Sequence, residues 1–138
     1  MMNKALIDSS FLYVLLNPKQ KDYERANITI KALSQLIVPY VVLTEVAFLF
    51  NREGGILAVT RFINTLIATK LTYEILIPED FVRMSNIMTT YRDAKFDFVD
   101  ACLMALSERL NITLICTLDQ RDFSIFRPRH VDRLELLP

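Results

Sequence analysis

One stretch of the sequence, residues 96–119, limits the fold more than any other. It reads FDFVDACLMALSERLNITLICTLD, and its first half repeats apolar residues every three or four positions, as on the core-facing side of a helix. The apolar run at residues 112–115 follows at once and is typical of a buried parallel strand. Asp100 therefore begins a helix, and Asp119 follows the next strand. Because ligands of open α/β sheets bind at the carboxyl ends of the strands, two acids near that edge indicate a functional site.

Short apolar strands alternate with helical patterns along the rest of the chain. The expected strands are residues 5–7, 37–38, 71–77, 112–115 and 134–137. The expected helices are residues 11–16, 23–36, a helix that carries Glu45 and ends at Gly54 and Gly55, residues 56–67 and 79–91, and the long helix opened by Asp100, whose apolar side carries Val99, Leu103, Leu106 and Leu110. This alternation predicts a three-layer α/β/α sandwich with a central parallel sheet, formed by residues 1–138 as a single domain.

Composition narrows the classes of function. A hydrophobic content of 52% is enough for a sizeable core, and Lys and Arg (16) balance Asp and Glu (16), so nucleic acid would bind only through a local basic patch. Cys102 and Cys116 lie in apolar segments without C-x-x-C spacing, which indicates core thiols in a reducing compartment. Asp8, Pro39 and Glu45 interrupt the apolar runs, so neither a signal peptide nor a membrane partner is expected, and the predicted location is cytoplasmic.

Four acids are expected at one edge of the sheet. Asp8 follows the first strand, Glu45 lies in the first turns of the helix after the second strand, and Asp100 and Asp119 complete the set. A single acid beside a helix start is more often a cap, or a partner of the helix dipole, than a ligand. Grouped carboxylates, however, repel one another and are tolerated mainly when a cation compensates their charge. Oxygen ligands favour magnesium or manganese, and such a site suits phosphodiester hydrolysis.

The residues around these acids have more than one interpretation. Asp97 is either the N-cap of the long helix or a fifth acid of the cluster. Ser9 or Ser10 is expected to cap the first helix, and Asp122 is expected to be a solvated turn residue.

The acidic segments resemble a known family. ALIDSS, LTEVAFL, FDFVDACLMALSERL and TLDQRDF resemble, in order, the four acidic motifs of PIN domains, small metal-dependent ribonucleases of the type found as VapC toxins. The ending FSIFRPRHVDRLELLP is similar to that of a PIN subgroup. The resemblance implies that the four acids named above are the catalytic residues and bind one or two Mg²⁺ or Mn²⁺ ions. Asp97, Thr117 and Ser10 would support them. It also implies an antitoxin that inserts an arginine or lysine among the acids, and a homodimer.

An RNA-binding surface is harder to locate. The basic residues after the last acid either hold RNA phosphates near the metal or form a solvated charged face, and Arg52 and Arg61 would extend the surface. These basic residues are Arg121, Arg127, Arg129, His130 and Arg133. The alternative to a ribonuclease is a catalytically quiet module that binds RNA or a protein partner. Phe48, Leu49 and Phe50 make their helix apolar on more than one face, which predicts self-association.

Overall fold

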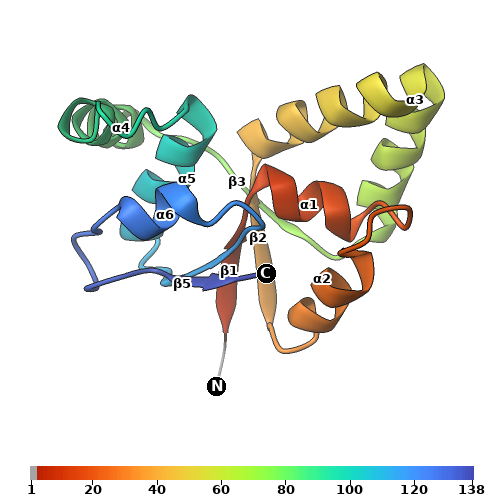
Figure 1. Ribbon diagram of the computed structural model, residues 1–138, viewed down its shortest axis with the longest axis horizontal. Helices are drawn as coiled ribbons and strands as arrows, with labels where there is room; N and C mark the ends of the chain where they lie inside the picture. The colour runs from red at the N-terminus through yellow and green to blue at the C-terminus, as the bar shows by residue number, and fades with distance from the viewer. Residues whose placement is uncertain (1–2) are drawn as a thin grey trace.

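A five-stranded parallel sheet forms the centre of the computed structural model, which describes residues 3–138 (Figure 1). The order of strands across the sheet is β3-β2-β1-β4-β5. The strands are β1 (Lys4–Ile7), β2 (Gln35–Pro39), β3 (Thr72–Glu74), β4 (Leu114–Cys116) and β5 (Glu135–Leu137). The predicted parallel sheet is confirmed, with the last strand at one edge.

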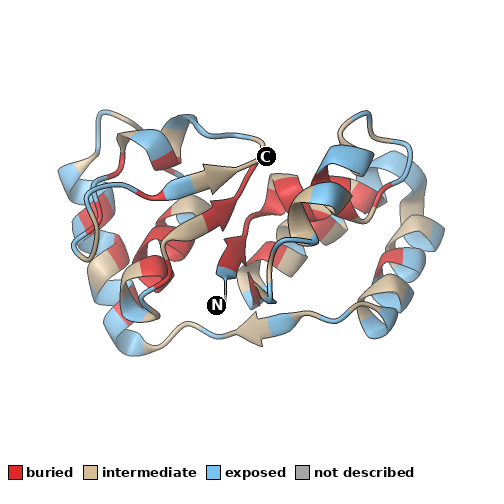
Figure 2. Ribbon diagram, turned by 90° about the horizontal axis from the view of Figure 1, so that it is seen from below, coloured by how far each residue is buried: buried red, intermediate tan, exposed pale blue. Residues whose placement is uncertain are grey.

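Six helices flank the sheet within the described residues. They are α1 (Ser9–Leu15), α2 (Tyr23–Ile30), α3 (Tyr40–Ala68), α4 (Pro78–Thr90), α5 (Phe98–Arg109) and α6 (Arg121–Ile125). One group consists of α1 packed on α2 and α3, and the other consists of α5 packed on α4 and α6. Figures 1 and 2 show the two groups on opposite sides of the strands, which is the predicted three-layer arrangement.

The strands of the centre are buried because helices cover both faces of the sheet. Ala5, Leu6 and Ile7 of β1 have no exposed surface, and Figure 2 shows the buried residues concentrated along the central strands. Cys102 and Cys116 are also buried, as expected for core thiols. Within residues 3–138, no helix combines the length and the apolar character needed to cross a membrane.

Three local predictions differ from the structure. α2 ends at Ile30 instead of residue 36, because the amides of Ser34 and Gln35 donate to the Asn3 carbonyl and start β2. The strand expected at residues 71–77 is shorter, and the helix α6 was not predicted. Gly55 does separate two helical segments of α3, since its φ of 71° is a conformation that favours glycine.

The parallel arrangement places the residues after β1, β2 and β4 at one edge of the sheet. The register joins Ile7 to Cys116, and the Asp8 amide donates to the Cys116 carbonyl at 3.1 Å. The turn after β1 therefore lies beside the segment after β4. We call this edge the carboxyl edge.

Candidate active site

Asp8 ends β1 and begins α1. Its Oδ1 accepts hydrogen bonds from the Phe11 amide (2.9 Å) and from the Ser10 hydroxyl (2.8 Å), and the residue is only 5% exposed. Asp8 is thus the N-cap of α1, and the prediction that Ser9 or Ser10 caps this helix is wrong. The reason is the backbone: Asp8 has the extended conformation of an N-cap, whereas both serines already belong to the helix.

Burial raises the pKa of Asp8 to about 6. The neighbouring Thr117 side chain and hydrogen bonds from the Phe11 amide and the Ser10 hydroxyl favour the charged form and oppose this rise, while the charge of Asp119 adds to it. Asp8 and Asp119 are therefore close enough to interact electrostatically, although they are far apart in sequence.

Two hydroxyl groups tie the turn after β1 to the turn after β4. Ser10 donates to Asp8 and accepts from the Leu118 amide at 3.0 Å. Thr117 is fully buried, and its hydroxyl accepts from the Asp119 amide (3.0 Å) and donates to the Asp119 carbonyl (2.9 Å). Ser10 and Thr117 therefore fix the backbone positions of Asp8 and Asp119 relative to each other.

Asp97 is the N-cap of α5. Its Oδ1 accepts from the Asp100 amide at 2.8 Å. It also acts as a member of the acid cluster, because its charge contributes to the raised pKa of Asp100. Both interpretations of Asp97 therefore hold.

Asp100 has the most perturbed carboxyl group of this edge. Burial raises its pKa to about 9, and a side-chain hydrogen bond with Asp122 and the charges of Asp97, Asp122 and Asp8 add to the rise. A hydrogen bond between two carboxyl groups requires a proton on one of them. In the metal-free protein at neutral pH, Asp100 is therefore protonated and donates to Asp122.

Asp122 is the residue that sequence reasoning missed. It was predicted to be a solvated turn residue, but its side chain is only 15% exposed and faces Asp100 from the first turn of α6. The error came from not recognising α6. The spacing of Phe123 and Phe126, both buried and three residues apart, was the available signal for a short helix packed on the core.

Glu45 stands apart from these acids. It is the sixth residue of α3 and is half-buried, so it lies beyond the first turn and does not complement the helix dipole there. No hydrogen bond or ion pair involving Glu45 is formed among residues 3–138, and its charge is not among the causes that raise the pKa of Asp8 or Asp100. Hydrogen bonds and charge effects therefore link Asp8, Asp97, Asp100, Asp119 and Asp122 to one another, and none of these links involves Glu45 among the described residues.

The donor chemistry of this cluster suits a hard divalent cation, while its present spacing does not. All donors are carboxylate oxygens, and the only ion pair with a basic side chain that the cluster makes among the described residues is Asp122 with Arg121, at 2.6 Å. In that same part of the chain, however, no three acidic, histidine or cysteine side chains are placed so that they could hold a metal ion together. Metal binding would therefore require the acid side chains to move towards one another.

The predicted phosphate-binding residues separate into two places. Arg121 lies beside Asp122, and Arg127 donates to the Ser124 carbonyl at the end of α6. The Arg129 amide, in contrast, donates to Glu108 (2.9 Å), and His130 Nε2 contacts the Ile112 carbonyl (2.8 Å).

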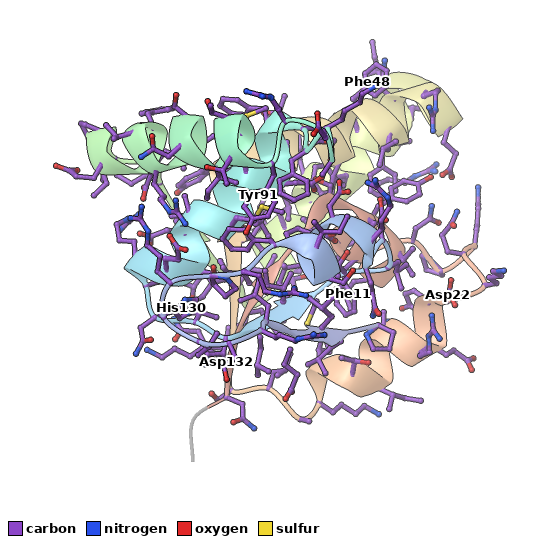
Figure 3. All side chains as sticks on the ribbon, turned by 60° about the vertical axis from the view of Figure 1, so that its left-hand side comes forward. Phe11, Asp22, Phe48, Tyr91, His130 and Asp132 are labelled. Carbon is purple, nitrogen blue, oxygen red and sulfur yellow. The ribbon has the colours of Figure 1, made fainter. Side chains whose placement is uncertain are left out.

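The second of these places is far from the acids. Glu108 follows Asp100 by eight helical residues, which is about 12 Å along α5. Figure 3 shows His130 at the opposite end of the molecule from Phe48, which lies on α3. Arg129 and His130 therefore do not belong to the carboxyl edge, contrary to the interpretation of the basic residues as one surface.

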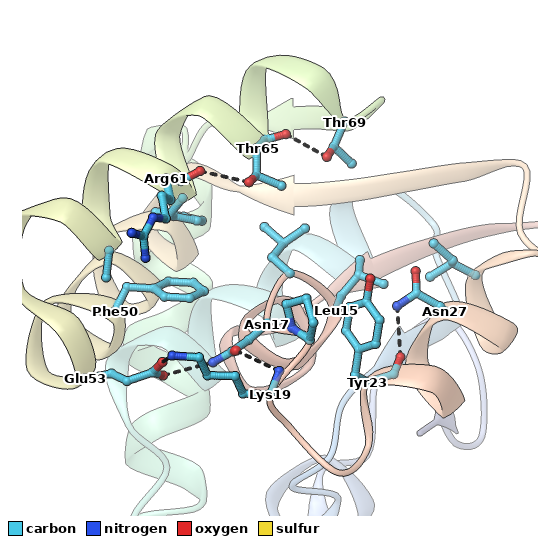
Figure 4. Close-up of a pocket in the computed structure, with 15 residues that line it drawn as sticks. Leu15, Asn17, Lys19, Tyr23, Asn27, Phe50, Glu53, Arg61, Thr65 and Thr69 are labelled. Carbon is cyan, nitrogen blue, oxygen red and sulfur yellow. Dashed lines mark hydrogen bonds and ion pairs between the residues drawn. The ribbon is translucent and has the colours of Figure 1, made fainter.

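A cavity of about 520 Å³ lies away from the acids, between α1, α2 and α3 (Figure 4). Its floor is apolar and includes Leu15, Phe50 and Phe62. At its rim, Glu53 accepts hydrogen bonds from Tyr13 and Asn17 and pairs with Lys19 at 3.9 Å. The cavity could receive apolar side chains of a partner, but it contains none of the clustered acids.

Comparison with known proteins gives consistent matches. The family model described as PIN domain matches residues 5–127. Ribonuclease VapC26 of Mycobacterium tuberculosis is 26% identical over 135 residues, which cover 96% of this chain and 99% of that protein.

Solved structures agree with the fold. VapC20 of M. tuberculosis, described as a sarcin-ricin loop cleaving toxin, has a TM-score of 0.77 at 22% identity and covers 93% of this chain and 98% of its own. A toxin-antitoxin complex from Klebsiella pneumoniae has a TM-score of 0.68 at 16% identity, with coverage of 87% and 90%. VapBC2 of Rickettsia felis, bound to a promoter DNA fragment, has a TM-score of 0.69 at 10% identity, with coverage of 96% of each chain. At these identities the likeness concerns the fold alone.

Proposed function

The chain belongs to the PIN domain family, and we propose that it is a metal-dependent endoribonuclease that hydrolyses phosphodiester bonds of RNA in the cytoplasm. The observation that carries the proposal is the group of acids at the carboxyl edge. Asp8 and Asp100 are buried or partly buried carboxyl groups whose pKa values are raised by burial and by neighbouring acids. A buried carboxyl group with a raised pKa contributes little to the stability of the fold. Its presence therefore supports a catalytic role.

The proposed cofactor is Mg²⁺ or Mn²⁺, held by Asp8, Asp100 and Asp119, with Glu45 approaching from α3. When bound, such an ion lowers the pKa of an attacking water and neutralises charge on the phosphate. Asp8 is positioned for this by the first turn of α1, and Asp119 is positioned by the Thr117 hydroxyl. Asp97 holds the first turn of α5, and Asp100 keeps a proton that it gives up when it becomes a ligand.

Cleavage of RNA by the purified chain tests this proposal. We expect cleavage of a mixed-sequence RNA with Mg²⁺ or Mn²⁺ and none with excess chelator. RNA that is bound but never cleaved, with either metal present, would instead favour the catalytically quiet binding module.

We also propose that the protein is the toxin of a toxin-antitoxin pair. The relatives named VapC and the complexes of the structural neighbours support this partner class. The cavity between α1, α2 and α3 has the apolar floor that an antitoxin segment needs. A separate arginine or lysine of the antitoxin would pair with the acids at the carboxyl edge. A small open reading frame beside the gene, whose product binds this chain and stops RNA cleavage, would support a toxin. A nuclease that no such product inhibits would be a housekeeping enzyme.

We propose that the protein self-associates through the second half of α3, whereas the sequence predicts self-association through Phe48, Leu49 and Phe50. Phe50 is buried against Tyr13 and Phe62, so it does not add to the exposed apolar surface. The second half of α3, however, exposes Ile56 (80%), Ile63 (51%) and Ile67 (79%), which lie on one side of the helix because they are seven and four residues apart.

We expect the wild-type protein to sediment as a dimer at micromolar concentration and the Ile63→Asp variant to sediment as a monomer, because a charge in an apolar interface is left without a partner. Ile28→Asp on α2, also at an exposed isoleucine, is the matched control and should leave the dimer intact. A monomeric wild-type protein would contradict this expectation.

A further inference from the structure

Two exposed phenylalanines lie close in the chain to acids that the proposed function assigns to the metal site. Phe98 is the first residue of α5, between the N-cap Asp97 and Asp100, and 49% of its surface is exposed. Phe48 lies one helical turn after Glu45 on α3, and 62% of its surface is exposed. In Figure 3 it projects away from the body of the protein.

Most other aromatic side chains of the described residues are packed. Phe50 stacks on Phe62, and Tyr91 stacks on Phe96 with ring centroids 5.2 Å apart in each pair. Even the exposed Tyr40 is stacked on Tyr73, at 5.3 Å. Phe48 and Phe98 take part in no aromatic pair among residues 3–138, although burying such a side chain would stabilise the fold.

Basic side chains accompany both rings. Arg52 follows Phe48 by one turn of α3, and Lys95 lies three residues before Phe98. Both are exposed, and within the described part of the chain neither forms an ion pair. Each ring thus has an exposed basic residue within four positions of it in the chain. A ring beside a cation is the combination that binds unpaired nucleotides, because the ring stacks on a base and the cation attracts a phosphate.

We propose that Phe48 and Phe98 are positioning residues that stack on the bases on either side of the phosphate that a metal ion bound by the acids would hold. The inference rests on the proposed ribonuclease function. The bases of a duplex have no free face for a ring, so the two rings would act on unpaired nucleotides at the cleavage site. Each stacked base is expected to contribute about 5- to 150-fold to affinity.

The absence of tryptophan from the chain gives a direct test. Phe48→Trp and Phe98→Trp each introduce a single tryptophan, whose fluorescence a stacked base should quench. The probe is a mixed-sequence single-stranded RNA of about 12 nucleotides, titrated with Ca²⁺ as the only divalent ion, because Ca²⁺ binds carboxylate oxygens but its looser coordination suits in-line attack less well. We expect quenching by this RNA and much less by an abasic strand of the same length or by the duplex.

Phe81→Trp is the matched control. Phe81 is 51% exposed in the first turn of α4, and the neighbouring Asp80 pairs with Arg109 at the far end of α5 from Asp100. Its tryptophan should not be quenched. Equal quenching at positions 48, 81 and 98, or at none of them, would overturn the proposal.

Leucine substitutions separate stacking from simple burial. Phe48→Leu and Phe98→Leu should each weaken binding of the single-stranded RNA by about tenfold and leave binding of the abasic strand unchanged. If either variant instead alters the sedimentation of the free protein, the ring belongs to an interface between copies and the stacking proposal is wrong. If both variants cleave and bind RNA as the wild type does, stacking fails while the ribonuclease function stands. A wild-type protein that neither binds nor cleaves RNA would refute both.

Discussion

Replacing Asp100 with asparagine is expected to lower the rate of RNA cleavage by about a hundredfold or more. The substitution removes a carboxylate that the metal requires, and the stabilisation of charge by a metal ion amounts to several kcal/mol, with about 1.4 kcal/mol for each factor of ten in rate. Single-turnover cleavage of one RNA at saturating Mn²⁺ measures the effect without interference from product release.

The same variant should not be less stable than the wild type. In the metal-free protein at neutral pH, Asp100 carries a proton that it donates to Asp122, and the asparagine amide can donate in its place. The wild-type side chain must give up its proton on unfolding at that pH, which favours the unfolded chain, and asparagine has no proton to lose. We therefore expect a melting temperature equal to or above that of the wild type.

Asp132→Asn is the matched control, because it makes the same chemical change at an exposed position. Figure 3 shows Asp132 beside His130, at the end of the molecule opposite to Phe48. This variant should cleave RNA at the wild-type rate. Unchanged cleavage by Asp100→Asn would remove Asp100 from the site, and a large fall in its melting temperature would show that the residue has a structural role.

The parallel sheet could be predicted from the sequence because each central strand has a clear run of apolar residues. The apolar runs at β1 and β4 are short, β-branched residues occur in both, and an acid follows each of them, so the acids at the carboxyl edge followed from the parallel topology. Edge elements were less predictable. None of the three residues of β3 is buried, and the extent of such a strand depends on its single neighbour and not on its own pattern.

The contacts within the site depended on details that periodicity does not contain. Asp8 and Ser10 can both cap a helix, and only the backbone conformation at Asp8 decides between them. The partnership of Asp122 with Asp100 depends on α6, which has five residues and is too short for a clear helical period. The separation of Arg129 and His130 from Arg121 depends on the path of the chain after α6, which no local pattern predicts.

Replacing Asp8 with asparagine is expected to stabilise the metal-free protein at neutral pH but not at pH 4. The pKa of Asp8 rises from 3.8 to about 6 on folding. Below pH 3.8 both the folded and the unfolded protein hold the proton. Between pH 3.8 and about 6 the unfolded chain loses its proton while the folded protein keeps it, so the free energy of unfolding falls by about 3 kcal/mol over this range.

Asparagine at position 8 does not ionise, so the free energy of unfolding does not fall with pH on its account. Its side-chain oxygen can still accept a hydrogen bond from the Phe11 amide. Urea unfolding of both proteins at pH 4 and at pH 7.5, with chelator present, measures the difference. Asp132→Asn should show no such pH-dependent gain. A loss of stability in Asp8→Asn at both pH values would mean that the carboxylate matters mainly as a charged N-cap.

Binding of a divalent metal ion should lower the pKa values of Asp8 and Asp100, which burial and neighbouring charges raise in the metal-free protein. A ligand must be deprotonated, so binding of Mn²⁺ at mildly acidic pH should release protons, weaken as the pH falls, and raise the melting temperature with increasing metal concentration. Isothermal titration in two buffers of different ionisation enthalpy measures the protons released. Asp8→Asn should bind Mn²⁺ more weakly and release fewer protons, because one titrating ligand is missing. If millimolar Mn²⁺ neither binds nor stabilises the wild type, and Asp8→Asn behaves identically, the acids do not form one metal site and the ribonuclease proposal loses its physical basis.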